Sequence, residues 1–399
     1  MSDAPFAMTT AQASWVKATA VLCLALLLSA CASHWRPDET ADVHYPPWLL
    51  TGERLFDEPI GDGEVPLTDI SAPTEEMRAY VSAMLDGVRS NPARFRALFA
   101  GLARDGYFRA VYSANQTLTA AETFELRGGN CLSYTNMFIA LAREAGLDAS
   151  YQVVDVPPSW DADSGFLIRY THVNVLVRGV RLEPGALPSV TVDFNVVHPE
   201  DEYRRWPVSD DYAQALFHAN HSVSLLREGR TREGFAHLRR GLEVSPGNLD
   251  LWINLGAFYA TQGDYEASIA AYEVALQLDP DSRAAFSGLA RSHGNAGNET
   301  LARMYADKER NYRERNPYFH YALAQAAFER ADFEASLAHI EDAISLKSRT
   351  PKFFLMRALV QERLGQVDAA ESSIRRARRL GLEPGVKAEV LRQMGLATI

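Results

Sequence analysis

The chain has 399 residues, too many for a single hydrophobic core, and its length suggests about two to three domains. Hydrophobic residues make up 47% of it and charged residues 23%, a globular composition that excludes a disordered, collagen-like or coiled-coil chain. Its 40 Lys and Arg against 51 Asp and Glu give a formal net charge of -11, which argues against a general affinity for nucleic acid.

The first thirty residues have the pattern of an export signal. An apolar run over residues 21–28 follows Lys17 and leads into Leu-Ser-Ala-Cys, ending at Cys31. Residues 18–30 are too few to cross a bilayer, which takes ~20. The Leu-Ser-Ala-Cys ending resembles the lipobox of bacterial lipoproteins, which implies that residues 1–30 are a signal peptide and that Cys31 carries the lipid. An ordinary cleaved signal or a buried hairpin is the alternative.

Cys31 is followed by Ala and Ser rather than Asp, a pattern that in lipoproteins usually goes with the outer membrane. We therefore expect a lipid-anchored protein of the bacterial cell envelope that faces the periplasm. Residues 31–69 are rich in Pro, Asp and Glu without sustained periodicity, and we predict a tether or linker there. If Cys23 leaves with the signal and Cys31 is lipidated, Cys131 is the one remaining thiol and no internal disulfide can form.

Residues 70–210 lack a repeat and are long enough for a core of their own. Helices are expected over 74–85 and 92–104. In the segment that follows them, two glycines precede Cys131, and an apolar pattern with helical spacing then continues until Gly146. Cys131 is therefore predicted at a helix N-terminus, where unpaired amides and the macrodipole favour a thiolate over a thiol. The alternative is a small apolar residue that fills the start of a helix.

Two polar residues interrupt the predicted strands that follow. His172 comes 41 residues after Cys131, and Asp193 comes another 21 residues later, each within a run of β-branched residues. Taken singly, a histidine in a strand is more often structural and an aspartate near a strand end more often solvated. Their occurrence together with Cys131 favours a catalytic set.

The order of cysteine at a helix start, histidine on one strand and aspartate on the next resembles the transglutaminase-like superfamily, relatives of papain-type cysteine proteases. Arg-Gly-Gly-Asn-Cys-Leu-Ser around Cys131, Thr-His-Val-Asn-Val around His172 and Val-Asp at Asp193 carry the resemblance, over about residues 117–197. It implies that Cys131 is the nucleophile, that His172 is the general base and later acid, and that Asp193 orients the imidazole. Gln116 as a second oxyanion donor, and Tyr170 and Asn195 as supporting residues, stay open.

The C-terminal part repeats every 34 residues. The pattern Trp252-x2-Leu-Gly-x2-Tyr259, continued by a tyrosine, an alanine and Pro280, resembles a tetratricopeptide repeat, and the register holds over about five units across 211–399. The units are expected to start near residues 215, 249, 283, 317 and 351 and to stack into a superhelix. The resemblance implies that a protein or peptide partner binds in its groove; a rigid spacer is the alternative.

The predicted architecture is an α+β transglutaminase-like, papain-like domain followed by an all-α tetratricopeptide-repeat superhelix. The sequence has neither a His-x-x-x-His nor a Cys-x-x-Cys motif backed by carboxylates, so we expect no metal site and no cofactor. The expected function is amide or acyl chemistry by a thiol enzyme, with hydrolysis favoured over cross-linking. The alternative is an envelope scaffold whose transglutaminase-like domain is degenerate.

Overall fold

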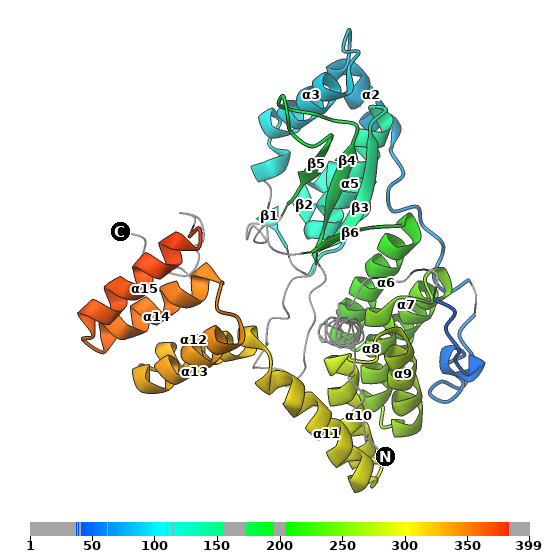
Figure 1. Cartoon of the computed structure of the whole chain (residues 1–399). Helices are drawn as coiled ribbons and strands as arrows, with labels where there is room; N and C mark the ends of the chain where they lie inside the picture. Colours follow the sequence, from blue (N-terminus) through cyan, green and yellow to red (C-terminus); the bar gives the residue numbers. More distant parts are fainter. Residues whose placement is uncertain are drawn as a thin grey trace, which may run out of the picture. The chain divides into compact units, whose positions relative to one another are not determined.

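The computed structural model describes residues 37, 39, 41–61, 63–109, 111–113, 115–154, 172–194 and 204–382. Contacts divide the chain into Met1–Pro37 and Asp38–Ile399, and every described helix and strand lies in the second unit (Figure 1). The predicted signal peptide over 1–30, the lipidation site Cys31, and Tyr170 and Asn195 lie outside the described residues.

An α+β domain comes first. Its helices precede the main sheet: α2 (Glu75–Met84), α3 (Asn91–Arg104), η2 (Tyr107–Arg109), α4 (Ala120–Leu126) and α5 (Cys131–Glu144). Among the described residues, the sheet has four antiparallel strands in the order β5-β4-β3-β6: β3 (Asp148–Val154), β4 (His172–Arg178), β5 (Ser189–Val192) and β6 (Arg205–Val208). A short parallel pair joins β1 (Val111–Tyr112) to β2 (Gly128–Gly129).

Helix α5 is the central helix of this domain. All of its residues from Leu132 to Ala142 are buried, because α5 packs against β3 and β4 on one side and contacts α2, α3 and α4 as well (Figure 1). Strand β3 has buried residues at each of its last four positions, as expected for a strand covered on both faces. This packing fixes the N-terminus of α5 close to the start of β4.

In the described part of the chain after β6, ten helices follow in five hairpins. They are α6 (Asp210–Arg227), α7 (Thr231–Val244), α8 (Leu249–Thr261), α9 (Tyr265–Leu278), α10 (Arg283–Asn295), α11 (Glu299–Glu314), α12 (Pro317–Glu329), α13 (Phe333–Leu346), α14 (Pro351–Arg363) and α15 (Val367–Arg379). The first helices of the last four hairpins begin 34 residues apart, at the predicted positions. Helix α6 begins earlier than predicted, because Ser209 caps it and two aspartates occupy its first turn.

Small residues let helices approach closely, both within a hairpin and between neighbouring hairpins. A Cβ atom added at Gly256 would lie 2.8 Å from the ring of Tyr272, and one added at Gly288 would lie 2.2 Å from the same ring. The hydroxyl of Ser268 donates to the carbonyl of Gly256 over 2.7 Å and lies 2.8 Å from the hydroxyl of Ser292. The tyrosine ring therefore fills the space that the two glycines leave open.

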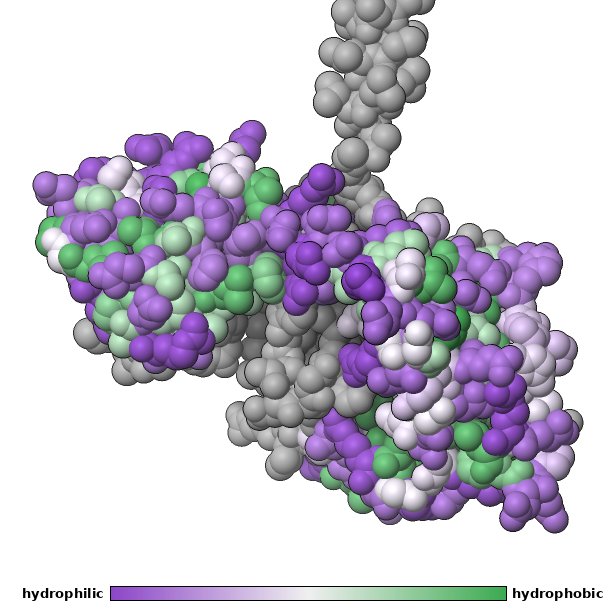
Figure 2. All heavy atoms as spheres, turned by 90° about the horizontal axis from the view of Figure 1, so that it is seen from below, coloured by the Kyte–Doolittle hydropathy of each residue, from purple (hydrophilic) through white to green (hydrophobic). Residues whose placement is uncertain are grey.

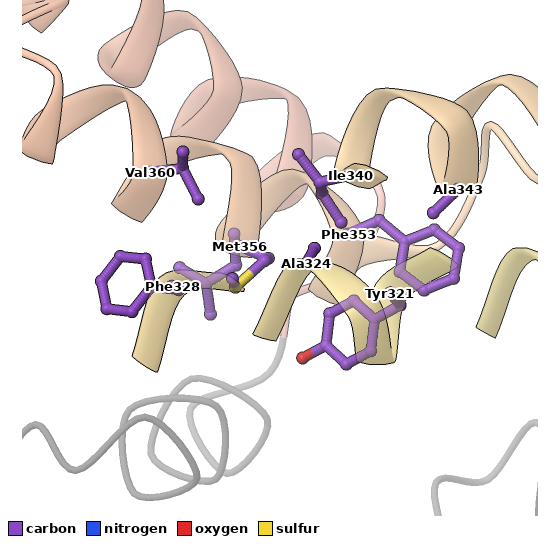
Figure 3. Packing of buried hydrophobic residues seen from close by; sticks show 9 residues of the cluster. Tyr321, Ala324, Phe328, Ile340, Ala343, Phe353, Met356 and Val360 are labelled. Carbon is purple, nitrogen blue, oxygen red and sulfur yellow. The ribbon is translucent and has the colours of Figure 1, made fainter. Parts of the chain in front are cut away.

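The last two hairpins share one hydrophobic cluster, shown in Figure 3. Tyr321 and Phe328 from α12, Ile340 from α13, and Phe353 and Met356 from α14 are all buried in it. The rings of Tyr321 and Phe353 stack with their centroids 5.3 Å apart. One repeat alone could not bury these side chains, so the stacking of consecutive repeats stabilises each of them.

Residues 45–65, here called the clasp segment, pack against α7, α8 and α9. The ring of Tyr45 lies 4.8 Å from that of Trp252, and the buried hydroxyl of Tyr259 donates to the carbonyl of Leu49 over 2.8 Å. Leu49 lies within the short helix η1 (Pro47–Leu50). Polar contacts extend this interface: Arg54 with Asp264 and Glu266, Arg232 with Glu64, Arg239 with the carbonyl of Ile60, and Arg240 with that of Val65. The sequence predicts a linker over these residues, whereas they form part of the folded repeat structure.

On the face in Figure 2, hydrophobic residues are interspersed with hydrophilic ones and form no continuous belt. No helix among the described residues combines the length and the apolar character needed to cross a membrane.

Candidate functional site

Cys131 is the first residue of α5, and the local sequence fixes it there. Helix α4 ends at Arg127, which adopts the left-handed conformation, and Gly129 follows with φ of 125°. A Cβ atom at Gly129 would lie 2.5 Å from the side chain of Ser133, so only glycine fits. Asn130 then caps α5: its side chain accepts from the amide of Ser133 over 3.1 Å, and the Ser133 hydroxyl accepts from the Asn130 amide over 3.2 Å.

The loop over residues 116–118 braces this cap. The carbonyl of Gln116 accepts from the amide of Asn130 over 2.9 Å, and the Thr117 hydroxyl accepts from the Asn130 side chain over 2.6 Å. The amide of Leu118 donates to the Ser133 hydroxyl over 2.8 Å. The backbone of Gln116 thus supports the N-terminus of α5, while its side chain is exposed. No contact of that side chain supports the role of oxyanion donor.

His172 is the first residue of β4, where it pairs with Val154 of β3, and it is 5% exposed. Its Nε2 atom lies 2.8 Å from Oδ1 and 2.9 Å from Oδ2 of Asp193. Cys131 also lies near enough to this imidazole to raise its pKa. The hydroxyl of Thr135, one turn after Cys131, donates to the carbonyl of Val173 over 3.3 Å and so ties α5 to the start of β4.

Asp193 directly follows β5, and a residue that the sequence analysis missed holds its carboxylate. The Nδ2 atom of Asn174 donates to Oδ2 of Asp193 over 3.0 Å, and Asn174 is fully buried. The signal for it was present: Asn174 stands two residues after His172, so both side chains lie on the same face of β4. The structure therefore brings His172, Asp193 and Asn174 together, at the start of a strand that is tied to the first turns of α5, the helix that begins with Cys131.

Aromatic packing fixes the chain just after Asp193. The ring of Phe194 lies 5.8 Å from those of Tyr134 and Phe138 on α5, and 5.9 Å from that of Phe108. Such ring pairs contribute about 0.5–1.5 kcal/mol each beyond the area that they bury. This cluster holds the end of β5 against the helix that carries Cys131.

The site favours a protonated imidazole. Burial acts to lower the pKa of His172, but the hydrogen bonds with Asp193 and Cys131 and the charges of these groups outweigh it and raise that pKa to about 9. At neutral pH the imidazolium would therefore lie between a carboxylate and the sulfur. An adjacent imidazolium is the arrangement that activates a thiolate nucleophile.

The comparisons with known families agree with these two parts. The model of the transglutaminase-like superfamily matches residues 78–179, which include Cys131 and His172, and models of tetratricopeptide repeats match residues 225–292 and 321–382. The chain carries a transglutaminase-like domain followed by tetratricopeptide repeats. The fold class predicted from the sequence is confirmed. The transglutaminase-like match ends before Asp193, so that residue's role depends on the geometry alone.

Solved structures match at low identity. MamA from Desulfovibrio magneticus RS-1 is 17% identical, over 42% of this chain and 94% of its own, with a TM-score of 0.25. The Cut9-Hcn1 hetero-tetramer of APC/C is 19% identical, over 45% of this chain and 36% of the matched one, with a TM-score of 0.25. At these scores the likenesses carry no argument about function. No curated protein matches the chain.

Proposed function

We propose that the protein is a thiol enzyme that acts on amide or acyl groups, with Cys131 as nucleophile, His172 as general base and acid, and Asp193 as the residue that orients the imidazole. The observation that carries this proposal is the contact of the buried His172 imidazole with the Asp193 carboxylate, beside a Cys131 thiol close enough to raise the pKa of that imidazole. A histidine that served only to fill a core would need neither partner.

The chemistry follows from these positions. The Cys131 thiolate attacks the carbonyl carbon, and the backbone amide of Cys131 is a natural donor to the oxyanion of the tetrahedral intermediate. The His172 imidazolium then gives its proton to the leaving amine, and a thioester forms. Water attacks the thioester while His172 takes its proton, which releases the acid and restores the thiol. An amine in place of water would give cross-linking; water is favoured as the abundant acceptor.

The repeats and the N-terminus complete the proposal. Tetratricopeptide repeats indicate interaction with a protein or peptide, and a partner bound there would be present at raised effective concentration near Cys131. Lipid attached to Cys31 would hold the protein at a bacterial membrane, with an outer-membrane location facing the periplasm favoured by the residues that follow the lipobox. Both statements rest on sequence patterns.

The first test is alkylation of the purified chain by iodoacetamide at about pH 6, read by mass spectrometry of the peptide that contains Cys131. We expect faster labelling than in the urea-unfolded chain, since the imidazolium stabilises the thiolate. His172→Ala should abolish the difference, and His44→Ala, an exposed histidine outside the site, should preserve it. Equal rates in the folded and unfolded wild type would contradict the enzyme proposal and leave the scaffold.

The second test is the intact mass of envelope peptides and proteins after incubation with the chain. Hydrolysis raises the summed mass of the products by one water molecule, and amine transfer lowers the mass of the joined product by one ammonia molecule. A scaffold leaves the masses unchanged. Cys131→Ser should abolish either change, and His172→Ala should slow it by about 10²–10⁴-fold, the usual contribution of a general base. Turnover that survives Cys131→Ser would overturn the assignment of the nucleophile.

A further inference from the structure

Two histidines and an aspartate face one another in the fourth repeat. His320 lies on α12, and His339 and Asp342 lie on α13, three residues apart and hence on one face of that helix. Their ligand atoms all lie within 4.8 Å of one another, and among the described residues no other such group of histidine, cysteine or acidic side chains occurs. The sequence analysis predicted no metal site because the two histidines come from different helices and match no short motif.

The orientation of His320 makes one ring nitrogen available. Its Nε2 atom lies 3.0 Å from the carbonyl oxygen of Glu314, and because a carbonyl only accepts, Nε2 donates. Nδ1 is buried, has no hydrogen-bond partner among the described residues, and lies 3.5 Å from Oδ2 of Asp342. This distance is long for a hydrogen bond, and two acceptors that face each other repel. A metal-binding histidine shows the same arrangement, with one nitrogen donating to a carbonyl and the other free.

The spacing fits a tetrahedral zinc ion. Bonds of ~2.0–2.1 Å to nitrogen and oxygen place the ligand atoms of such an ion about 3.3–3.4 Å apart. The separation of 3.5 Å between His320 and Asp342 is close to this value, and a small rotation of the His339 side chain would complete a three-ligand set. Asp342 is 59% exposed, so an ion could enter from solvent and keep a water molecule as its fourth ligand.

The two helices are held rigidly at this place. Tyr321 and Ile340, each next to one of the histidines in sequence, point into the hydrophobic cluster between the helices (Figure 3). The hydroxyl of Ser336 on α13 also donates to the carbonyl of Ala324 on α12 over 2.7 Å. Ligands on packed helices are positioned more accurately than ligands on loops, which reduces the reorganisation that binding requires.

The first repeat provides an internal comparison. His218 and His237 precede His320 and His339 by 102 residues each, which is three repeats, and their Nδ1 atoms lie 3.1 Å apart. Burial and neighbouring groups lower the pKa of His218 to about 3 and that of His237 to about 4, so this pair is neutral and can share one proton between its rings. Arg240 stands there in place of Asp342, and a cation disfavours a metal ion. Only the fourth repeat combines the pair with a carboxylate.

We propose that His320, His339 and Asp342 form a site for one divalent transition-metal ion, with Zn²⁺ the best match, that links α12 to α13 and leaves one coordination position open. Two imidazoles and a carboxylate are ligands that zinc commonly takes in proteins. The proposal is independent of the thiol chemistry, because none of the three residues belongs to the site of Cys131.

The test is zinc binding to the full chain, freed of metal with a chelator and with Cys23, Cys31 and Cys131 replaced by serine so that no thiol can compete. Calorimetry is expected to show one ion per chain, and Co²⁺ in its place should give the strong visible bands of a tetrahedral site. His339→Ala and Asp342→Asn should each weaken binding by at least about 10-fold, since loss of even an outer partner has that effect. Glu341→Gln, an exposed neighbour that loses the same charge as Asp342→Asn, should bind like the parent.

Far-ultraviolet circular dichroism checks that the variants keep their helices. Unchanged affinity in folded His339→Ala and Asp342→Asn, or the absence of stoichiometric binding in the parent, would overturn the proposal. Weakening by Glu341→Gln as large as that by Asp342→Asn would also overturn it, because the effect would then be one of general charge.

Discussion

Replacing Asp193 with asparagine should change the protonation of His172 more than any other property of the protein. The pKa of about 9, against an ordinary 6.5, corresponds to a net preference for the imidazolium of about 3 kcal/mol. Burial opposes that preference, and the hydrogen bond with Asp193 is the largest contribution in its favour. Asparagine keeps the size and an acceptor oxygen but removes the charge. We therefore expect the pKa of His172 to fall from about 9 to near or below 6.5 in Asp193→Asn.

Nuclear magnetic resonance of the chain labelled with carbon-13 in its histidine rings measures this directly. The chain has ten histidines, and His172→Gln identifies the signal that belongs to the site. Asp86→Asn, an exposed carboxylate elsewhere in the domain, supplies a matched loss of charge and should leave the titration unchanged. A wild-type His172 that titrates at or below 6.5, or the same pKa with and without Asp193, would refute the reasoning.

The same pKa predicts how stability depends on pH. Because the folded pKa of His172 lies above the unfolded value of 6.5, its contribution is fully present below that pH and is lost as pH rises through about 9. The free energy of unfolding of the domain should therefore fall by up to about 3 kcal/mol over this interval. Urea denaturation at several pH values measures how steeply the free energy of unfolding falls with pH, and His172→Gln should make that fall smaller. An equally steep fall in His172→Gln would mean that another group causes it.

Three further substitutions test the packing. Gly129→Ala places a methyl group against Ser133 in a left-handed backbone, so it should destabilise the domain by more than about 1 kcal/mol and slow alkylation of the thiol; normal stability and labelling would contradict the local geometry. In helix α10, Gly288→Ala should cost about 1–3 kcal/mol by overpacking a tyrosine ring. The matched control is Gly294→Ala at an exposed position of the same helix, which should raise the stability measured by thermal denaturation by up to about 1 kcal/mol. Equal changes in stability for the two substitutions would contradict the close contact at Gly288. Tyr259→Phe should lower stability by about 0.5–1.5 kcal/mol through its lost hydrogen bond to the clasp segment, and an unchanged melting temperature would exclude that contribution.

The parts that the sequence predicted well are those in which local residues determine local structure. The 34-residue spacing predicted where four hairpins begin, since each repeat position has its own packing role, as Gly256 has beside Tyr272. The glycines before Cys131 predicted a helix start, which the cap at Asn130 provides. The placement of His172 and Asp193 followed from a resemblance, and it required two strands to pair in one particular register.

The features that sequence missed depend on contacts between distant residues. The clasp segment has no periodicity, and its hydrogen bond to Tyr259 spans 210 residues of chain. His320 and His339 are 19 residues apart on two helices, a spacing that has meaning only once the hairpin is folded. Asn174 resembles any polar residue in a strand until the carboxylate of Asp193 is placed beside it. In each case tertiary packing, which local patterns do not encode, makes the contact.

The clasp segment has a consequence for how the chain folds. It is made by the ribosome before the transglutaminase-like domain, yet the helices that it covers, α7 to α9, follow that domain in sequence. Closing so long a loop is slow, and until it closes the aromatic rings Phe235 and Trp252 lack part of their cover. A fragment that begins at residue 209 would contain all the described repeat helices and still expose these rings. Expression of the repeats alone would therefore require residues 45–65 to be supplied as a separate peptide or fused in front.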